Sequence, residues 1–227
     1  MTRATDIDAV VFDVLGTMVD EPRGLTAAIA EAAPAGDTAE LLALWQRHIE
    51  REQDRIVKGE RPFATADVLD GEAAAIVAEH AQVADAAAVA RLARAGRRHT
   101  AWPDAAAGLE RLARTFPVLA LSNANRSALL HLTAHAGLRW HQALSAEDAR
   151  TYKPAPGVYR LAVEAVGSPP ERVLMVAAHA WDLRGAQAIG MKTAYVRRPV
   201  GDPPGPDDAF DWQCESLGEL AEALEAG

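Results

Sequence analysis

Asp13 is the first residue whose type and setting could support chemistry. It follows residues 7–12, an apolar run with one charged residue, Asp8, and precedes Gly16 and Thr17. Gly and Thr permit a tight turn close to a ligand. An aspartate carboxylate is ionised at neutral pH, so it can act as a nucleophile without a base to activate it. The alternative is an Asp that caps a helix or closes a turn.

Two later segments supply neutral hydrogen-bonding groups and a cation. Ser122 and Asn123 follow a second apolar run and could hold the oxygens of an anion, although the same letters are typical of a helix start. Lys153 precedes Pro154, which can open a helix and leave the lysine as a fixed cation at its start. The alternative for Lys153 is a solvated surface charge, as for most lysines.

A fourth segment places a His and an Asp after a further apolar run. His179 and Asp182 follow residues 173–176, and Gly185 allows the next helix to approach closely. A histidine beside a catalytic carboxylate can donate to a leaving anion or move the proton of a hydrolytic water. The alternatives are a packed structural His and an Asp that caps a helix.

The elements that must position these groups follow the rhythm of an α/β fold. Four runs are mostly apolar, with Asp8 the one charged residue among them, as in strands buried on both faces of a parallel sheet: Ile7 to Phe12, Val118 to Leu121, Val173 to Val176 and Thr193 to Val196. Helical patterns precede most of them, which predicts a doubly wound parallel sheet. Ligands of such sheets bind beyond the carboxyl ends of the strands, where all four polar segments lie.

A long helical stretch interrupts this rhythm. Residues 18–100 are rich in Ala, Leu, Glu and Arg, with apolar residues at helical spacing. We therefore predict a Rossmann-like core made of residues 1–17 and 101–227, with residues 18–100 inserted as a helical cap. Residues 199–211 are loaded with Pro, Gly and Asp and are expected to form a surface loop before a last helix.

Composition limits the partners and the location. The 227 residues are 49% hydrophobic and 24% charged, an ordinary globular mixture. A formal net charge of −9 with scattered Lys and Arg argues against nucleic acid as a partner. The sequence has no apolar stretch of the roughly 18 residues that a membrane span needs and no signal-peptide pattern, so we expect no membrane partner and a cytoplasmic location. Cys214 is the only cysteine and is expected to be a packing residue.

The four polar segments together resemble the signature motifs of the haloacid dehalogenase superfamily. These are Asp-x-x-Gly-Thr from Asp13, Ser-Asn at 122–123, Lys-Pro at 153–154 and Asp-x-x-Gly-Ala from Asp182. The resemblance spans essentially the whole chain, including the inserted cap. It implies a two-domain α/β hydrolase that uses Asp13 as a covalent nucleophile.

Leu15 separates two branches of that superfamily. Most members are Mg²⁺-dependent phosphatases with a second Asp two residues after the nucleophile, where this chain has Leu15. Leucine has no proton to give, and lost general acid catalysis costs about 10² to 10⁴ in rate. A phosphatase would keep Asp13 and Asp182 as metal ligands but lack one carboxylate. The L-2-haloacid dehalogenase branch uses the same nucleophile without metal, so we expect no cofactor, with Mg²⁺ as the alternative.

Resemblance to the dehalogenase branch assigns the expected roles. Asp13 would attack the carbon that bears the halogen, Lys153 would hold Asp13, Asp182 would orient or deprotonate the hydrolytic water, and His179 is a further catalytic candidate. The expected substrate-binding residues are Thr17, Leu15, Trp45, Gln46, Arg47, Ser122, Asn123, Tyr159 and Trp181. Well-matched dehalogenases have Trp-Arg in the cap where this chain has Trp45 and Gln46, and Arg47 lies about 100° further round the helix.

The resulting hypothesis is a metal-independent hydrolytic dehalogenase of short 2-halo carboxylic acids, similar to (S)-2-haloacid dehalogenases. Haloacetates, including fluoroacetate, are further candidate substrates, and the resemblance allows a homodimer. Two alternatives stay open. One is a Mg²⁺-dependent phosphatase of small phosphate esters, and the other is a non-catalytic member that binds an anionic metabolite or partner.

Overall fold

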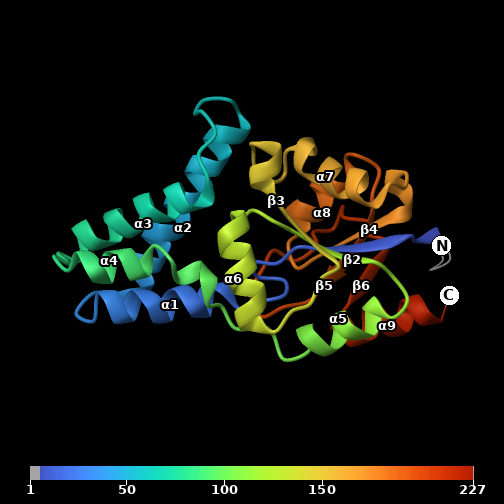
Figure 1. Ribbon diagram of the computed structural model, residues 1–227, viewed down its shortest axis with the longest axis horizontal. Coiled ribbons are helices and arrows are strands. Elements are labelled where there is room, and N and C mark those ends of the chain that lie inside the picture. The colour runs from blue at the N-terminus through green and yellow to red at the C-terminus, as the bar shows by residue number, and fades with distance from the viewer. Residues whose placement is uncertain (1–5, 227) are drawn as a thin grey trace.

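The fold is built around a parallel six-stranded sheet. The structure, a computed structural model, describes residues 6–226. The strand order is β3-β2-β1-β4-β5-β6, and every neighbouring pair is parallel (Figure 1). The strands are β1 (Ala9–Phe12), β2 (Val118–Ser122), β3 (Gln142–Ser145), β4 (Val173–Ala177), β5 (Lys192–Val196) and β6 (Trp212–Cys214). The predicted doubly wound sheet is confirmed.

Helices cover both faces of the sheet and form a separate layer beyond it (Figure 1). The helices are α1 (Glu21–Ala32), α2 (Thr38–Val57), α3 (Ala66–His80), α4 (Ala86–Leu92), α5 (Ala105–Ala113), α6 (Arg126–Ala136), α7 (Pro156–Val166), α8 (Ala180–Gln187) and α9 (Leu217–Glu225). Short 3₁₀ turns lie at η2 (Ala95–Arg97), η3 (Ala146–Ala149) and η4 (Pro170–Arg172).

The apolar strands form the core because their side chains alternate between the two faces. Val10 and Phe12 pack on one face with α5, α6 and α9, whereas Ala9 and Val11 pack on the other with α7 and α8. All four residues of β1 are fully buried, as expected for the centre of a sheet covered on both sides. The end of β1 therefore places Asp13 at the middle of the sheet edge.

Two strands were not predicted from the sequence. Gln142 and Ala143 begin β3 and are exposed, and β6 has only three residues. Both strands lie at the outer edges of the sheet, where one side has no neighbour and burial is incomplete. They therefore lack the continuous apolar run that marks the four inner strands.

The helices α1 to α4 have an apolar cluster of their own, which includes Leu25, Ile29, Trp45 and Val77. The segments that enter and leave this part run antiparallel, and the N–H of Trp102 donates to the carbonyl of Met18 at 3.0 Å. These helices bury their apolar sides against one another, which accounts for the apolar residues at helical spacing between β1 and β2. The exact division at residues 18 and 100 stays a prediction.

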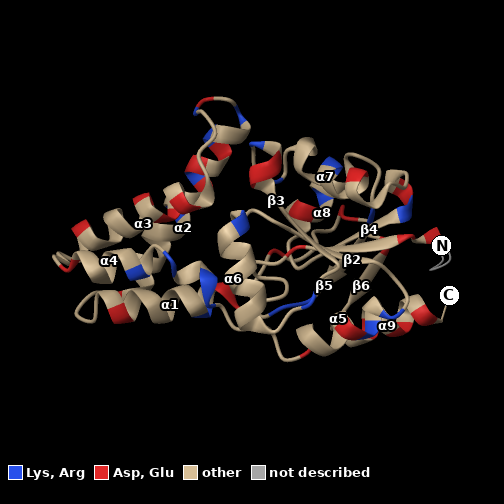
Figure 2. Cartoon of the chain, in the orientation of Figure 1, with Lys and Arg blue, Asp and Glu red and all other residues tan. Residues whose placement is uncertain are grey.

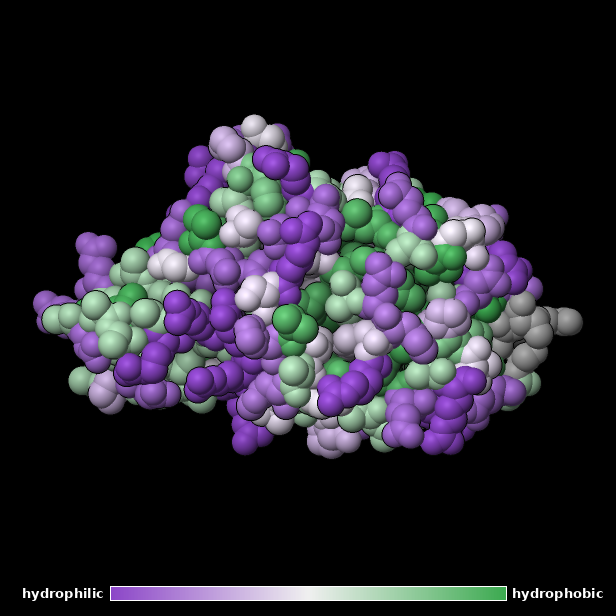
Figure 3. Space-filling model, viewed as in Figure 1, coloured by the Kyte–Doolittle hydropathy of each residue, from purple (hydrophilic) through white to green (hydrophobic). Residues whose placement is uncertain are grey.

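Charged residues occur along the helices of both parts of the molecule, with Lys and Arg interspersed among Asp and Glu (Figure 2). Hydrophilic residues cover most of the face seen in Figure 3, with smaller hydrophobic areas between them. Within residues 6–226, no helix has the length and apolar character that a membrane crossing requires.

Candidate active site

Both carboxylate oxygens of Asp13 are held by hydrogen-bond donors. Oδ2 accepts the hydroxyl of Thr17 at 2.6 Å, and Oδ1 accepts Lys153 Nζ at 2.9 Å. The Thr17 hydroxyl accepts the N–H of Ala178 at 2.9 Å, which links it to the end of β4. Asp13 is only 6% exposed. A carboxylate held at both oxygens has a fixed direction of attack, which a nucleophile needs.

Lys153 joins the nucleophile to a second buried acid. Its Nζ atom also donates to Asp182 Oδ2 at 2.8 Å, and the other oxygen of Asp182 accepts the hydroxyl of Tyr159 at 2.7 Å. Burial alone would lower the pKa of Lys153, but the attraction of Asp13 and Asp182 raises it above its usual value. The ammonium form is therefore favoured. Pro156, rather than Pro154, is the first residue of the helix that follows.

Two glycines allow the close approaches that this arrangement needs. Gly16 has a φ of +79°, and a Cβ there would lie 2.5 Å from Nε2 of His179. A Cβ at Gly185 would lie 2.4 Å from the hydroxyl of Tyr159. Any larger residue would displace a neighbouring side chain of the site, which explains both Gly residues after the two Asp residues.

The neutral polar residues at the end of β2 have different structural roles. Asn125 is the N-cap of α6 and accepts the N–H of Ala128, so the helix-start interpretation applies to that residue. The hydroxyl of Ser122 accepts the N–H of Ala124 at 3.1 Å and is fully buried. Asn123 accepts the N–H of Lys153 at 3.0 Å and donates to Gln53 Oε1 at 3.1 Å. Asn123 therefore connects the core to helix α2.

A cavity of about 650 Å³ lies over Asp13, between the sheet edge and helices α1 to α3. Eight of the predicted site residues line it: Asp13, Leu15, Trp45, Gln46, Asn123, Lys153, His179 and Trp181. The other predicted residues of the core do not line it and lie buried behind it: Thr17, Ser122, Tyr159 and Asp182. Those four residues are therefore placed to hold the lining side chains.

His179 lies at the edge of the cavity beside the nucleophile loop. Its Nε2 atom is 3.3 Å from the carbonyl oxygen of Leu15, and its ring centroid is 5.8 Å from that of Trp181. A parallel bridge pairs His179 with Asp202, whose carboxylate accepts the N–H of Trp181 at 3.1 Å. The predicted loop at residues 199–211 thus contributes to the site, which its composition did not indicate.

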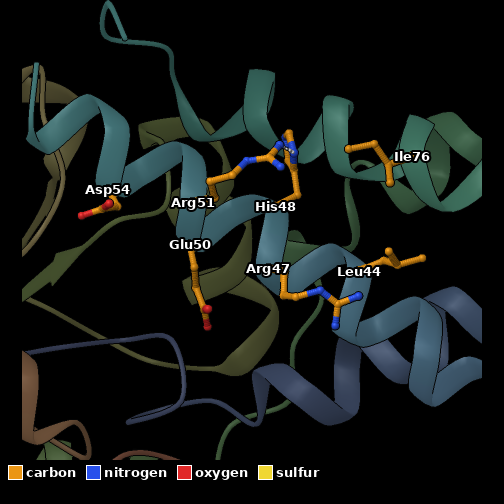
Figure 4. Close-up of a pocket in the computed structure, with 7 residues that line it drawn as sticks. All are labelled: Leu44, Arg47, His48, Glu50, Arg51, Asp54 and Ile76. Carbon is orange, nitrogen blue, oxygen red and sulfur yellow. Dashed lines mark hydrogen bonds between the residues drawn. The ribbon is translucent and has the colours of Figure 1, made fainter. Parts of the chain in front are cut away.

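Arg47 is not brought together with the other predicted site residues. It lines a separate groove along α2 together with Leu44, His48, Arg51 and Ile76 (Figure 4). A substrate-binding role for Arg47 therefore stays a prediction, and this placement does not support it. The reason for the placement is the helical rotation of about 100° per residue, which turns Gln46 towards the cavity and carries Arg47 past it.

Three residues that line the cavity were not singled out from the sequence. Glu21 begins α1, Asp70 lies in α3, and His99 lies in the segment that returns to the core. Asp20 and Pro22 gave a helix-start signal around Glu21, but one that also fits a solvated first turn. Nothing near Asp70 or His99 in the sequence indicates that folding places them on the same cavity.

The carboxylates near the nucleophile fit a divalent metal poorly. Lys153 places an ammonium between Asp13 and Asp182, the two acids that would be ligands. Among residues 6–226, no group of three or more His, Cys, Asp or Glu side chains is arranged to hold a metal ion. Mg²⁺ prefers several oxygen ligands in octahedral geometry, whereas here the ammonium of Lys153 lies between the two carboxylates.

The sequence is similar to those of known hydrolases. The family model of haloacid dehalogenase-like hydrolases matches residues 7–190. The chain is 34% identical to (S)-2-haloacid dehalogenase 4A of Burkholderia cepacia over 219 residues, which is 93% of this chain and 92% of that protein.

Solved structures agree as well. A defluorinating L-2-haloacid dehalogenase superposes with a TM-score of 0.90 at 30% identity, covering 99% of both chains. The L-2-haloacid dehalogenase of Xanthobacter autotrophicus with chloropropionic acid covalently bound gives 0.84 at 28% identity, covering 96% of this chain and 98% of that chain. This chain therefore belongs to the haloacid dehalogenase-like hydrolases, in the L-2-haloacid dehalogenase branch of that superfamily.

Proposed function

We propose that the chain hydrolyses the carbon–halogen bond of short (S)-2-halo carboxylic acids through an ester of Asp13. The observation that carries the proposal is the Asp13 carboxylate, held by Thr17 and Lys153 beneath a cavity, with Leu15 where a phosphatase carries its acid. A halide leaves as a stable anion and needs no proton, so this chemistry tolerates a leucine there.

In the first step a carboxylate oxygen of Asp13 attacks carbon 2 of the substrate. A carbon–oxygen bond forms while the carbon–halogen bond breaks, and the halide leaves with the bonding electrons. Lys153 stays protonated beside the carboxylate and fixes its orientation. His179 lines the same cavity, which supports a role as hydrogen-bond donor to the departing anion when both ring nitrogens carry a proton, because Nε2 faces the carbonyl of Leu15.

In the second step water attacks the carbonyl carbon of the Asp13 ester. The ester bond breaks, Asp13 regains its carboxylate, and the 2-hydroxy acid leaves with one proton of the water while the other is released. The ammonium of Lys153 stabilises the negative charge that develops on the carbonyl oxygen. Asp182 lies behind Lys153 and is held by Tyr159, which supports a positioning role for Asp182 through Lys153.

One experiment tests both the dehalogenase proposal and the phosphatase alternative. Protein treated with EDTA is incubated with both enantiomers of 2-chloropropionate, with chloroacetate and with fluoroacetate, and halide is measured beside an Asp13→Asn control. We expect release that needs no added metal and is lost in Asp13→Asn. Phosphate-ester hydrolysis that requires Mg²⁺, with no halide released, would overturn the proposal in favour of a phosphatase.

A single turnover in ¹⁸O-labelled water tests the ester itself. With enzyme in excess over (S)-2-chloropropionate, the label should enter the peptide that contains Asp13, because water attacks the carboxyl carbon. Label that appears only in the 2-hydroxy acid would instead mean direct attack of water on carbon 2. The expected homodimer, the cytoplasmic location and the lack of nucleic-acid or membrane partners stay predictions.

A further inference from the structure

The cavity above Asp13 carries more negative than positive groups. Its lining includes five acids, Asp13, Glu21, Glu50, Asp70 and Asp202. Within the described chain the lining includes one lysine, Lys153, and no arginine. A 2-halo carboxylate brings a further negative charge into this cavity. Lys153 is already shared between two carboxylates, so the remaining acids have no matching cation.

Glu21 and Asp70 are the two lining acids that are partly removed from solvent and whose carboxyl groups lack partners among the described residues. Both are half-buried, and within residues 6–226 neither side chain makes a hydrogen bond or an ion pair. Buried or half-buried carboxyl groups are normally hydrogen-bonded or paired, because leaving water without a partner costs free energy. Burial raises the pKa of Glu21 to about 7 and that of Asp70 to about 8, and each acid lacks a neighbouring cation that would offset this effect fully.

His99 is the third member of this group and packs against α1, the helix that begins with Glu21. The residue is 1% exposed and lines the cavity, and its Nδ1 atom is buried without a hydrogen-bond partner within the described residues. Its Nδ1 edge lies against Gly24, where a Cβ would come within 2.1 Å, while Nε2 lies beside Gly96, another lining residue. Burial lowers the pKa of His99 to about 4, so the ring is neutral and has one acceptor nitrogen.

We propose that Glu21, Asp70 and His99 form a subsite for a cationic group, such as a primary ammonium, at the far end of the substrate. Two carboxyl groups and a neutral imidazole together offer acceptors for the three N–H donors of an ammonium. The substrate would then be a zwitterionic 2-halo acid with an amino group at the end of its side chain. This inference rests on the proposed function for the reacting end alone.

Binding without turnover tests the subsite directly. Straight-chain carboxylates of three to seven carbons are titrated with and without a terminal amino group, for example 5-aminopentanoate against pentanoate. Trp45 and Trp181 line the cavity, so their fluorescence reports binding. At the best chain length we expect the amino compound to bind about tenfold more tightly or better. Its ammonium would form charge-assisted hydrogen bonds with acceptors of the subsite that otherwise have no partner.

Two variants assign that preference to the subsite. Glu21→Gln with Asp70→Asn should bring the affinity ratio of amino to alkyl ligands close to one. Glu79→Gln is the matched control, because Glu79 lies on the same helix as Asp70, is exposed, and is not among the residues that line the cavity. A ratio near one in the wild-type protein at every chain length, or a ratio that survives the double substitution, would overturn the proposal.

Turnover separates this inference from the proposed function. Halide release is compared for 5-amino-2-chloropentanoate and 2-chloropentanoate, as a ratio of kcat/KM. Release from both compounds without an amino preference would refute the subsite and leave the dehalogenase chemistry intact. An amino preference in binding with no halide released from any 2-halo acid would refute the chemistry and leave the subsite.

Discussion

Replacing Lys153 with Met removes the charge that holds two buried carboxylates together. Nζ lies 2.9 Å from Asp13 and 2.8 Å from Asp182, and Lys153 is 3% exposed. The two oxygens are therefore less than about 6 Å apart, where two charges repel by about 3 kcal/mol at an effective dielectric constant of about 20. Deleting one partner of a buried ion pair costs about 3 to 5 kcal/mol. We expect Lys153→Met to lower the free energy of unfolding by about that amount and to abolish halide release.

Urea unfolding at neutral pH, followed by tryptophan fluorescence and circular dichroism, measures this loss. Lys58→Met is the matched control, because Lys58 pairs with Asp54 at 2.6 Å but both side chains are more than half exposed. Its effect should stay within about 0.5 kcal/mol. Adding Asp182→Asn to Lys153→Met removes the repulsion and should recover at least half of the lost stability. A Lys153→Met variant within about 1 kcal/mol of wild type, or a double variant no more stable than the single, would refute the reasoning.

Three further substitutions follow from close contacts and from one shifted pKa. Gly16→Ala adds a Cβ 2.5 Å from His179 at a φ of +79°, so kcat/KM for a 2-halo acid should fall about tenfold or more, while urea unfolding shows a loss of only about 1 to 2 kcal/mol. Unchanged turnover would argue against the placement of His179. Gly185→Ala crowds the Tyr159 hydroxyl at 2.4 Å and should lower the melting temperature by an amount that corresponds to about 1 to 3 kcal/mol. An unchanged melting temperature would mean that the site relaxes freely. The hydrogen bond from Arg61 holds the pKa of Glu52 at about 2, below its value of 4.5 in an unfolded chain, so this stabilisation is present above pH 4.5 and disappears towards pH 2. The stability difference between wild type and Glu52→Gln, from urea titrations at several pH values, should therefore narrow over that range, and a constant difference would contradict it.

Asp13 and Asp182 could be predicted from the sequence because each follows an inner strand, β1 or β4. Lys153 follows the edge strand β3 and the turn η3, and only the Lys-Pro motif indicated it. Parallel strands bring their carboxyl ends to one edge, so Asp13, Lys153 and Asp182 converge although they lie far apart in the chain. The family resemblance added the order of the motifs. The inner strands were recognisable because burial on both faces requires apolar residues at every position.

The cap side of the cavity could not be predicted in the same way. Whether Gln46 or Arg47 faces the nucleophile depends on the rotation of α2 about its axis, which its packing against α1 and α3 fixes. Glu21, Asp70 and His99 come from three separate elements, and only the tertiary arrangement brings them together. Helical spacing indicates which face of a helix is apolar but does not reveal which polar side chain meets a cavity.

The central place of β1 also has a consequence for synthesis on the ribosome. β1 needs β2 on one side and β4 on the other, and β4 begins at Val173, more than 160 residues after β1 begins. At about 5 to 20 residues per second, β1 waits roughly 8 to 30 seconds for its second neighbour. Helices α1 to α4 have an apolar cluster of their own and can fold during that interval. The nascent chain can therefore contain the folded helices α1 to α4 beside an incomplete sheet. Asp13 has neither Lys153 nor Asp182 as a neighbour until the ribosome has released part of the last third of the protein.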